Sequence, residues 1–171
     1  MNKKTILLCG ATGFIGRNIL EKFSKNSKYK IRAVYHHKTA LEEYDVEWVY
    51  ADLNDVSDVR RIIPGADIIL QFAATTSGAG DIVSKPYVHV TDNAVMNSLL
   101  LREAYENGVE HFMFPSCTVM YQPNKDALKE TDFDGNKELL PKYFGVGNTK
   151  VYIEKMCEFY SRLNKTKHTV L

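Results

Sequence analysis

The chain has 171 residues, of which 44% are hydrophobic and 25% charged, and its net charge is +1 at pH 7. This length and composition fit one soluble globular domain and exclude a disordered chain. The near-neutral charge gives no reason to expect nucleic acid, and no apolar run approaches the roughly 20 residues that cross a bilayer, so no membrane partner is expected. Three cysteines without CxxC spacing favour a reducing, cytoplasmic location.

The predicted elements alternate between strand and helix along the chain. Short apolar or β-branched runs predict strands, and the amphipathic stretches between several of them predict helices. The strands are nearly all apolar, which is typical of a parallel sheet covered on both faces. The pattern therefore predicts an α/β fold with a doubly wound parallel sheet. Strands are expected at residues 5–10, 29–35, 47–51, 68–73, 111–115 and 168–171, and helices at residues 13–24, 55–62, 91–107 and 148–163.

Three glycines mark the first strand-to-helix turn, in the segment "CGATGFIG". Gly10 would make the tight turn, Gly13 would let the backbone approach phosphates, and Gly16 would let the helix pack closely on the sheet. A pyrophosphate would then lie at the helix N-terminus. We expect a dinucleotide here, the alternative being a simple tight turn. The residues expected to line it are Gly10, Ala11, Thr12, Gly13, Phe14, Ile15 and Gly16.

The end of the second predicted strand bears on the choice of cofactor. An acidic residue about 20 positions after the last glycine would bind the ribose 2′-hydroxyl of NAD. His36 stands there, followed by His37 and Lys38, in "AVYHHK". These side chains suit a 2′-phosphate, so we expect NADP, with NAD and a merely solvated loop as alternatives. The five histidines show no metal-ligand spacing beyond this adjacent pair, so no metal is expected.

Several segments together resemble the extended short-chain dehydrogenases/reductases, the NAD-dependent epimerase/dehydratase family. The G-x-x-G-x-x-G spacing of "GATGFIG" is similar to that family's signature. "ADLND" resembles its adenine-contacting Asp-Leu pair, and "QFAATTSG" resembles its strand end beside the cofactor ribose. "TDNAVMNSLLLREAYENGVEHFMF" resembles its long helix, with Asn93 at the usual Asn. The resemblance implies further cofactor contacts from Asp52, Leu53, Phe72, Ala73 and Ala74.

The resemblance covers essentially the whole chain and is greatest to the GDP-fucose synthase type. It implies a Rossmann-like NAD(P)-binding domain over residues 1–171 of a nucleotide-sugar epimerase, reductase or dehydratase, which moves a hydride at a (keto-)sugar carbon. It also implies a homodimer paired through the helices at 91–107 and 148–163. A catalytically impaired NAD(P)-binding scaffold or sensor is the alternative. Because the chain ends inside an apparent sixth core strand, we expect truncation before a C-terminal substrate lobe.

The family's acid/base pair is only partly matched. There a Tyr transfers the proton, and a Lys four residues later lowers the pKa of that Tyr and holds the ribose. "TKVYIEKMCEFYSRL" resembles the helix that carries this lysine, here Lys150, but position 146 is Val. Tyr143 lies seven residues before Lys150, about 10.5 Å along a continuous helix. A helix that begins only at Asn148, after two glycines, would leave Tyr143 in a loop able to fold back. A packing tyrosine is the alternative.

The family's substrate-polarising hydroxyl is also displaced. "FPSCTVMY" resembles the strand end whose Ser or Thr stands four residues before a tyrosine. Counting back from Tyr121 gives Cys117, between Ser116 and Thr118. A thiol is a weak hydrogen-bond donor, so either Thr118 substitutes or the step is impaired; a small buried residue is the alternative for Cys117. The expected catalytic residues are Lys150, Tyr143, Cys117, Thr118 and Ser116.

Overall fold

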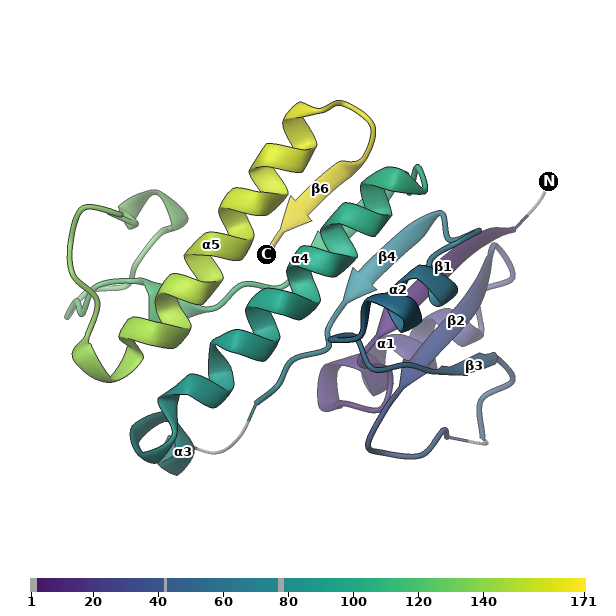
Figure 1. Ribbon diagram of the computed structural model, residues 1–171, viewed down its shortest axis with the longest axis horizontal. Coiled ribbons are helices and arrows are strands. Elements are labelled where there is room, and N and C mark those ends of the chain that lie inside the picture. The colour runs from purple at the N-terminus through teal and green to yellow at the C-terminus, as the bar shows by residue number, and fades with distance from the viewer. Residues whose placement is uncertain (1–2, 42, 77–78) are drawn as a thin grey trace.

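The computed structural model describes residues 3–41, 43–76 and 79–171. Six parallel strands form one sheet in the order β3-β2-β1-β4-β5-β6 (Figure 1). The order reverses between β1 and β4, the switch point at which doubly wound sheets bind ligands. The predicted doubly wound parallel sheet is thus confirmed. The strands are β1 (Lys4–Cys9), β2 (Tyr29–Tyr35), β3 (Glu47–Tyr50), β4 (Ile68–Gln71), β5 (His111–Phe114) and β6 (Lys167–Val170).

Helices cover both faces of the sheet. On one face Leu20 of α1 packs with Ile6 and Leu8 of β1. On the other face α2, α4 and α5 pack over Leu7 and Cys9 of the same strand, and α4 and α5 lie side by side (Figure 1). Because successive side chains of a strand alternate between faces and both faces are covered, β1 is apolar and buried from Ile6 to Cys9. The helices are α1 (Phe14–Ser24), α2 (Val56–Ile62), α3 (Ala79–Ser84), α4 (Thr91–Glu106) and α5 (Phe144–Arg162), with short 3-10 turns η1 (Pro86–His89), η2 (Thr118–Met120), η3 (Glu130–Asp132) and η4 (Pro141–Tyr143).

The last strand differs from its expected place in the core. β6 pairs only with β5 among the described strands, and each of its residues is exposed or half-buried. Its apolar Val170 and the following Leu171 are both exposed. Among the described residues β6 has one neighbouring strand, a property that its apolar residues alone do not reveal. In the described part of the chain, no helix combines the length and apolarity needed to cross a membrane.

The start of α5 corrects a second expectation. The helix begins at Phe144 rather than near Asn148, and both glycines lie inside it. A Cβ on Gly147 would come 2.5 Å from Leu139 Cδ1 and 3.0 Å from the Val119 carbonyl oxygen. This close packing compensates for the roughly 1 kcal/mol cost of a helical glycine. Tyr143 is therefore the N-cap residue of a continuous helix and not part of a loop that ends near Asn148.

Candidate active site

The glycine turn follows β1 at the carboxyl edge of the sheet and leaves no room for a side chain at Gly10 or Gly16. Gly10 has a φ of +74°, and a Cβ there would come 2.6 Å from the backbone nitrogen of Ala73. A Cβ on Gly16 would come 2.1 Å from the Gly10 carbonyl oxygen, and one on Gly13 would come 3.2 Å from it. The first turn of α1 is thus packed directly on the strand end. This geometry requires glycine at positions 10 and 16.

The N-terminus of α1 suits an anion. Its N-cap residue is Gly13, which supplies no side-chain cap, and the first turn carries no acidic residue. The first backbone N–H groups of a helix have no partner within the helix, and the helix dipole favours negative charge there. Ala11 is buried and Thr12 half-buried in the turn, while Phe14 is 86% exposed and Ile15 lies exposed beside it.

A buried polar network holds the segment that follows β4 against β1 and α4. The Phe72 backbone N–H donates to the Cys9 carbonyl oxygen at 3.1 Å. Gln71 Nε2 donates to the Ala73 carbonyl oxygen and to Asn97 Oδ1, both at 3.1 Å. Sequence reasoning assigned no role to Gln71 or Asn97, although a polar residue at the end of the apolar run "IILQ" was a usable signal.

The same network extends along the chain to Asn93. Its side-chain oxygen accepts from the Thr75 N–H at 3.0 Å, and its Nδ2 donates to the carbonyl oxygens of Thr75 at 2.8 Å and His89 at 2.9 Å. Phe72 and Ala73 are half-buried and Ala74 is exposed at this edge. Ser77 and Gly78, the end of the "QFAATTSG" segment, lie outside the described residues.

The expected adenosine contacts gather at the ends of β2 and β3. His36 directly follows β2, with its ring centroid 4.0 Å from that of His37 and 5.6 Å from that of Tyr50. Asp52 follows β3, and its Oδ1 accepts from the Asn54 N–H at 2.9 Å. Leu53 is only 5% exposed and belongs to the core. Its side chain therefore has little surface left for a ligand.

Lys150 lies in the second turn of α5 and reaches back to the end of β5. Its Nζ donates to the Pro115 carbonyl oxygen at 3.4 Å and lies 4.5 Å above the centroid of the Phe114 ring. Burial lowers the pKa of Lys150, while the charges of Cys117 and Glu154 raise it. Lys150 therefore lies beside the segment in which the polarising group was expected.

The three residues of that segment have different environments. Ser116 Oγ donates to Met120 Sδ at 3.4 Å, and its backbone N–H donates to the Leu171 carbonyl oxygen at 2.7 Å. Thr118 is exposed at the start of η2, whereas Cys117 is half-buried. Burial raises the pKa of the Cys117 thiol, and the backbone amides of Val119 and Met120 and the Lys150 charge oppose the rise. The Lys150 charge thus acts on the Cys117 thiol.

Tyr143 directly precedes the first turn of α5, whereas Lys150 lies in the second turn. The Lys142 ammonium stands 4.6 Å from its ring centroid, and the Tyr143 N–H donates to the Leu140 carbonyl oxygen at 2.8 Å. Because α5 is continuous from Phe144, the seven residues to Lys150 span about 10.5 Å of helix axis. Val146 occupies the position one turn before Lys150.

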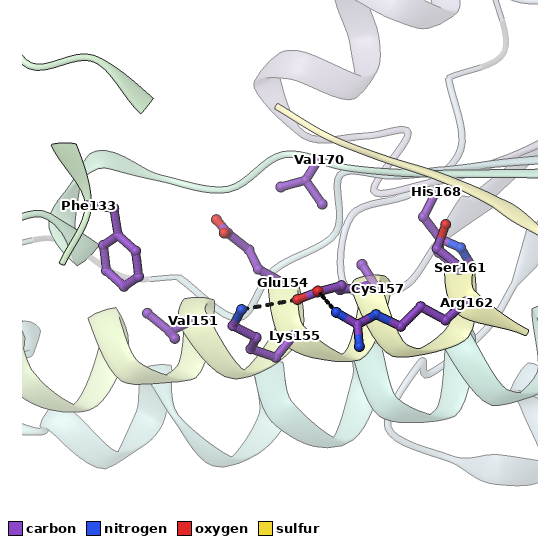
Figure 2. Close-up of a pocket in the computed structure, with 10 residues that line it drawn as sticks. Phe133, Val151, Glu154, Lys155, Cys157, Ser161, Arg162, His168 and Val170 are labelled. Carbon is purple, nitrogen blue, oxygen red and sulfur yellow. Dashed lines mark hydrogen bonds and ion pairs between the residues drawn. The ribbon is translucent and has the colours of Figure 1, made fainter. Parts of the chain in front are cut away.

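A pocket of about 380 Å³ lies elsewhere, along α5 and β6 (Figure 2). Glu158 on its wall is paired with Lys155 at 3.0 Å and with Arg162. None of the residues expected from the sequence to bind cofactor or act in catalysis lines it, so size alone does not identify the functional site. Its lining consists of Phe133, Val151, Glu154, Lys155, Cys157, Glu158, Ser161, Arg162, His168 and Val170.

Comparison with known families shows which family the chain belongs to. The family described as "NAD dependent epimerase/dehydratase family" matches residues 6–171. The chain belongs to this family. Its curated relatives include GDP-mannose 3,5-epimerase 1 of Oryza sativa subsp. japonica, 27% identical over 167 residues that make up 94% of this chain and 43% of the relative. UDP-glucose 4-epimerase of Vibrio cholerae is 26% identical over 66% of this chain and 34% of its own length.

Solved structures share the fold of this epimerase/dehydratase-family chain. A GDP-D-glycero-L-gluco-heptose synthase of Campylobacter jejuni, determined in the presence of NADPH, superimposes with a TM-score of 0.82 at 17% identity, over 99% of this chain and 47% of its own. A UDP-glucose 4-epimerase gives a TM-score of 0.82 at 25% identity, over 98% and 50% of the two chains. The chain thus spans about half the length, or less, of these relatives.

Proposed function

We propose that residues 1–171 form the NAD(P)-binding domain of a nucleotide-sugar epimerase, reductase or dehydratase. The turn through Gly10, Gly13 and Gly16 at the β1/β4 switch point is the observation that carries the proposal. Side chains are excluded at Gly10 and Gly16, and an uncapped helix N-terminus opens beside the turn. Both features fit the pyrophosphate of a dinucleotide.

The residues present fit the remainder of that cofactor. His36, His37 and Lys38 offer donors and positive charge to a 2′-phosphate, which supports NADP over NAD. Asp52 lies on the adenosine side, and Lys150 would hold the nicotinamide ribose beside the end of β5. When bound, the cofactor supplies or accepts the hydride at the sugar carbon. Two C. jejuni enzymes of this fold were determined with NADPH or NADP, and another neighbour was determined with NAD and UDP-glucose.

The substrate class is supported by the relatives. Those at 25–27% identity include enzymes named for GDP-mannose and UDP-glucose. We therefore propose a nucleotide sugar whose carbonyl or hydroxyl carbon exchanges the hydride, next to the Ser116–Thr118 segment. The closer similarity to GDP-fucose synthases stays a prediction. A binding scaffold without turnover is the second candidate, favoured by Val146 in the tyrosine position.

Assembly and location are part of the proposal. Val95 of α4, Tyr152 and Phe159 of α5, and Leu163 at the C-cap of α5 are exposed apolar residues of the two adjacent helices. Tyr152, Phe159 and Leu163 are spaced by seven and four residues and so share one helix face. A homodimer through α4 and α5 would bury this surface. All three cysteines are free, which supports a cytoplasmic location.

Cofactor titration followed by turnover tests the function. We expect NADPH to bind with quenching of protein fluorescence and more tightly than NADH. We then expect GDP-mannose or UDP-glucose, added with NADP⁺ or NAD⁺, to give an isomeric or oxidised sugar by NMR. Absence of binding of either cofactor would refute the cofactor site. Cofactor binding without turnover, in a chain extended to the length of the relatives, would favour the scaffold.

A further inference from the structure

The position where a proton-transferring tyrosine is expected holds no side chain that can transfer a proton. A lysine that assists a proton donor needs that donor within hydrogen-bond reach of the reacting atoms. Position 146, one turn before Lys150, is Val, and Tyr143 lies two turns away along a continuous helix. The inference below rests on the proposed hydride transfer and asks which side chain beside Lys150 can supply the proton.

Helix α5 is fixed against the segment that carries Cys117. Lys150 Nζ lies 3.4 Å from the carbonyl oxygen of Pro115, two residues before Cys117, and 4.5 Å above the Phe114 ring. One turn earlier, the missing side chain of Gly147 lets the helix backbone approach Val119, two residues after Cys117. Contacts on both sides of Cys117 therefore hold it next to the lysine, at the carboxyl edge of the sheet where ligands bind.

The two charged side chains that act on the Cys117 thiol, Lys150 and Glu154, both lie on α5. Lys150 lowers the pKa of the thiol, and Glu154, one turn further along the helix, raises it; burial is the largest effect and also raises it. Glu154 raises the pKa of Lys150 and of the nearby Tyr121 as well. Burial is thus the dominant influence on the thiol, and it favours the protonated form. A group in this state can donate a proton.

We propose that the Cys117 thiol, beside Lys150, is the proton donor and acceptor of the reaction, in place of a tyrosine. In the reducing direction the carbonyl carbon gains the hydride, and the electron pair of the C=O π bond moves to oxygen. That pair forms an O–H bond with the proton of Cys117 Sγ, whose S–H bond breaks. The Lys150 ammonium stabilises the resulting thiolate, which takes a proton from solvent; oxidation of the alcohol follows the reverse path.

The other two cysteines allow a direct chemical test. Cys9 and Cys157 are buried, and burial raises the pKa of each to about 12. Iodoacetamide reacts with thiolate, so it should alkylate Cys117 selectively in the folded chain. The site of alkylation is read by peptide mass spectrometry, and the rate is measured from pH 6.5 to 9.5. The alkylation is repeated in the presence of NADPH and of 2′-phospho-ADP-ribose, a matched ligand that lacks the nicotinamide.

We expect saturating NADPH to stop alkylation of Cys117, whereas 2′-phospho-ADP-ribose leaves most of it. We also expect Lys150→Met to slow the reaction at pH 7.5 by about twofold or more and Glu154→Gln to speed it by a similar factor, as for pKa changes of about half a unit. Lys142→Met, in which the lysine over Tyr143 is lost, should leave the rate unchanged. Loosened packing alone would not make one α5 variant react more slowly and the other more rapidly than the wild type.

Three results would overturn the inference. If NADPH binds but does not protect Cys117, the thiol does not lie at the nicotinamide, while the proposed cofactor site stands. If Lys150→Met and Glu154→Gln change the rate in the same direction, the thiol is not governed by these charges. If neither NADPH nor NADH binds to the folded chain, the proposed function fails and the inference fails with it.

Discussion

At the residue scale, the proposed cofactor site depends on glycines, whose lack of a side chain allows close backbone contact. Gly10 and Gly16 bring the strand end, the segment after β4 and the first turn of α1 within backbone contact. Any added carbon at position 16 must displace the Gly10 carbonyl rather than a flexible side chain. The spacing of these glycines was readable from the sequence because the steric requirement is local.

Gly16→Ala tests this requirement. Overpacking of this kind costs about 1–3 kcal/mol, so we expect the midpoint of thermal unfolding to fall by several degrees and NADPH binding to weaken at least tenfold. Gly80→Ala is the matched control, because a Cβ there would meet no described atom within 4 Å. Calorimetry and NADPH titration measure the two effects. An unchanged NADPH affinity in Gly16→Ala would refute the role of the glycine turn.

The assignment of the proton donor is also a residue-scale prediction. General acid–base catalysis typically contributes about 10²–10⁴-fold, so Cys117→Ala should lower kcat at least 100-fold, with little change in NADPH affinity. Tyr143→Phe should keep kcat within about fivefold, because Tyr143 is two turns from Lys150. Single-turnover hydride transfer, followed by NADPH absorbance, compares the two variants. The reverse order of effects would restore Tyr143 as the acid/base.

The family resemblance assigned Lys150 and Cys117 to one reaction, but the sequence did not show the packing that brings their segments together. Lys150 and Cys117 were found by their place in linear patterns, and their juxtaposition depends on α5 packing against η2. That packing involves Gly147 and Leu139, which are distant from Cys117 in the chain. No local pattern could have revealed it.

At the element scale, helix and strand types were predictable and their limits were less so. The sequence pattern predicted α1, α2 and α4 to within one residue at each end, and in α2 the Asp55 side chain also caps the helix. It failed at the start of α5, where tertiary packing overrides the low helix propensity of Gly145 and Gly147. The six-residue α3 and the 3-10 turns were not foreseen, since each is too short for a periodic signal.

The β5–β6 pair makes a prediction of its own about pH. His111 Nε2 and Thr169 Oγ1 lie 2.8 Å apart across this pair. The His168 ring lies 5.8 Å from that of Phe112, and both of its nitrogens are buried within the described structure. Burial lowers the pKa of both histidines. The unfolded chain therefore binds protons first as pH falls through about 6.5.

The contribution of these two histidines to the free energy of unfolding is accordingly full above about pH 6.5. It decreases as the pH falls further toward their folded-state pKa values. We expect the unfolding midpoint to fall by a few degrees between pH 7.5 and 5.5, since about 1 kcal/mol shifts it by 2–4 °C in a chain of this size. His168→Phe should flatten this decline, whereas the exposed His37→Ala should not. Thermal scans across the pH range decide the matter, and an equal slope in His168→Phe would contradict the prediction.

At the scale of the whole molecule, the proposed dimer accounts for exposed apolar side chains on adjacent helices. Phe159→Glu places a charge in the surface formed by Val95, Tyr152 and Leu163. We expect this variant to be monomeric where the wild type sediments as a dimer, because a buried unpaired charge costs several kcal/mol. Leu128→Glu, an exposed residue of the loop before η3, is the control. A wild-type monomer at high concentration would refute the dimer.

The topology of the whole sheet was the most predictable property of the chain. Alternating strands and helices leave few arrangements, since parallel crossovers are right-handed and ligands bind at the switch point. The position of β6 at the open edge was not predictable, because the residues of one strand do not reveal how many neighbours it has.

A structure determined with NADPH bound tests the central claim most directly. We expect the pyrophosphate at the N-terminus of α1 over Gly13 and the nicotinamide at the carboxyl end of β5. Cys117 Sγ should lie nearer to the nicotinamide C4 than Tyr143 Oη does, and close enough for a hydrogen bond to the reacting oxygen. A pyrophosphate bound away from the glycine turn, or a nicotinamide remote from both Lys150 and Cys117, would contradict this account.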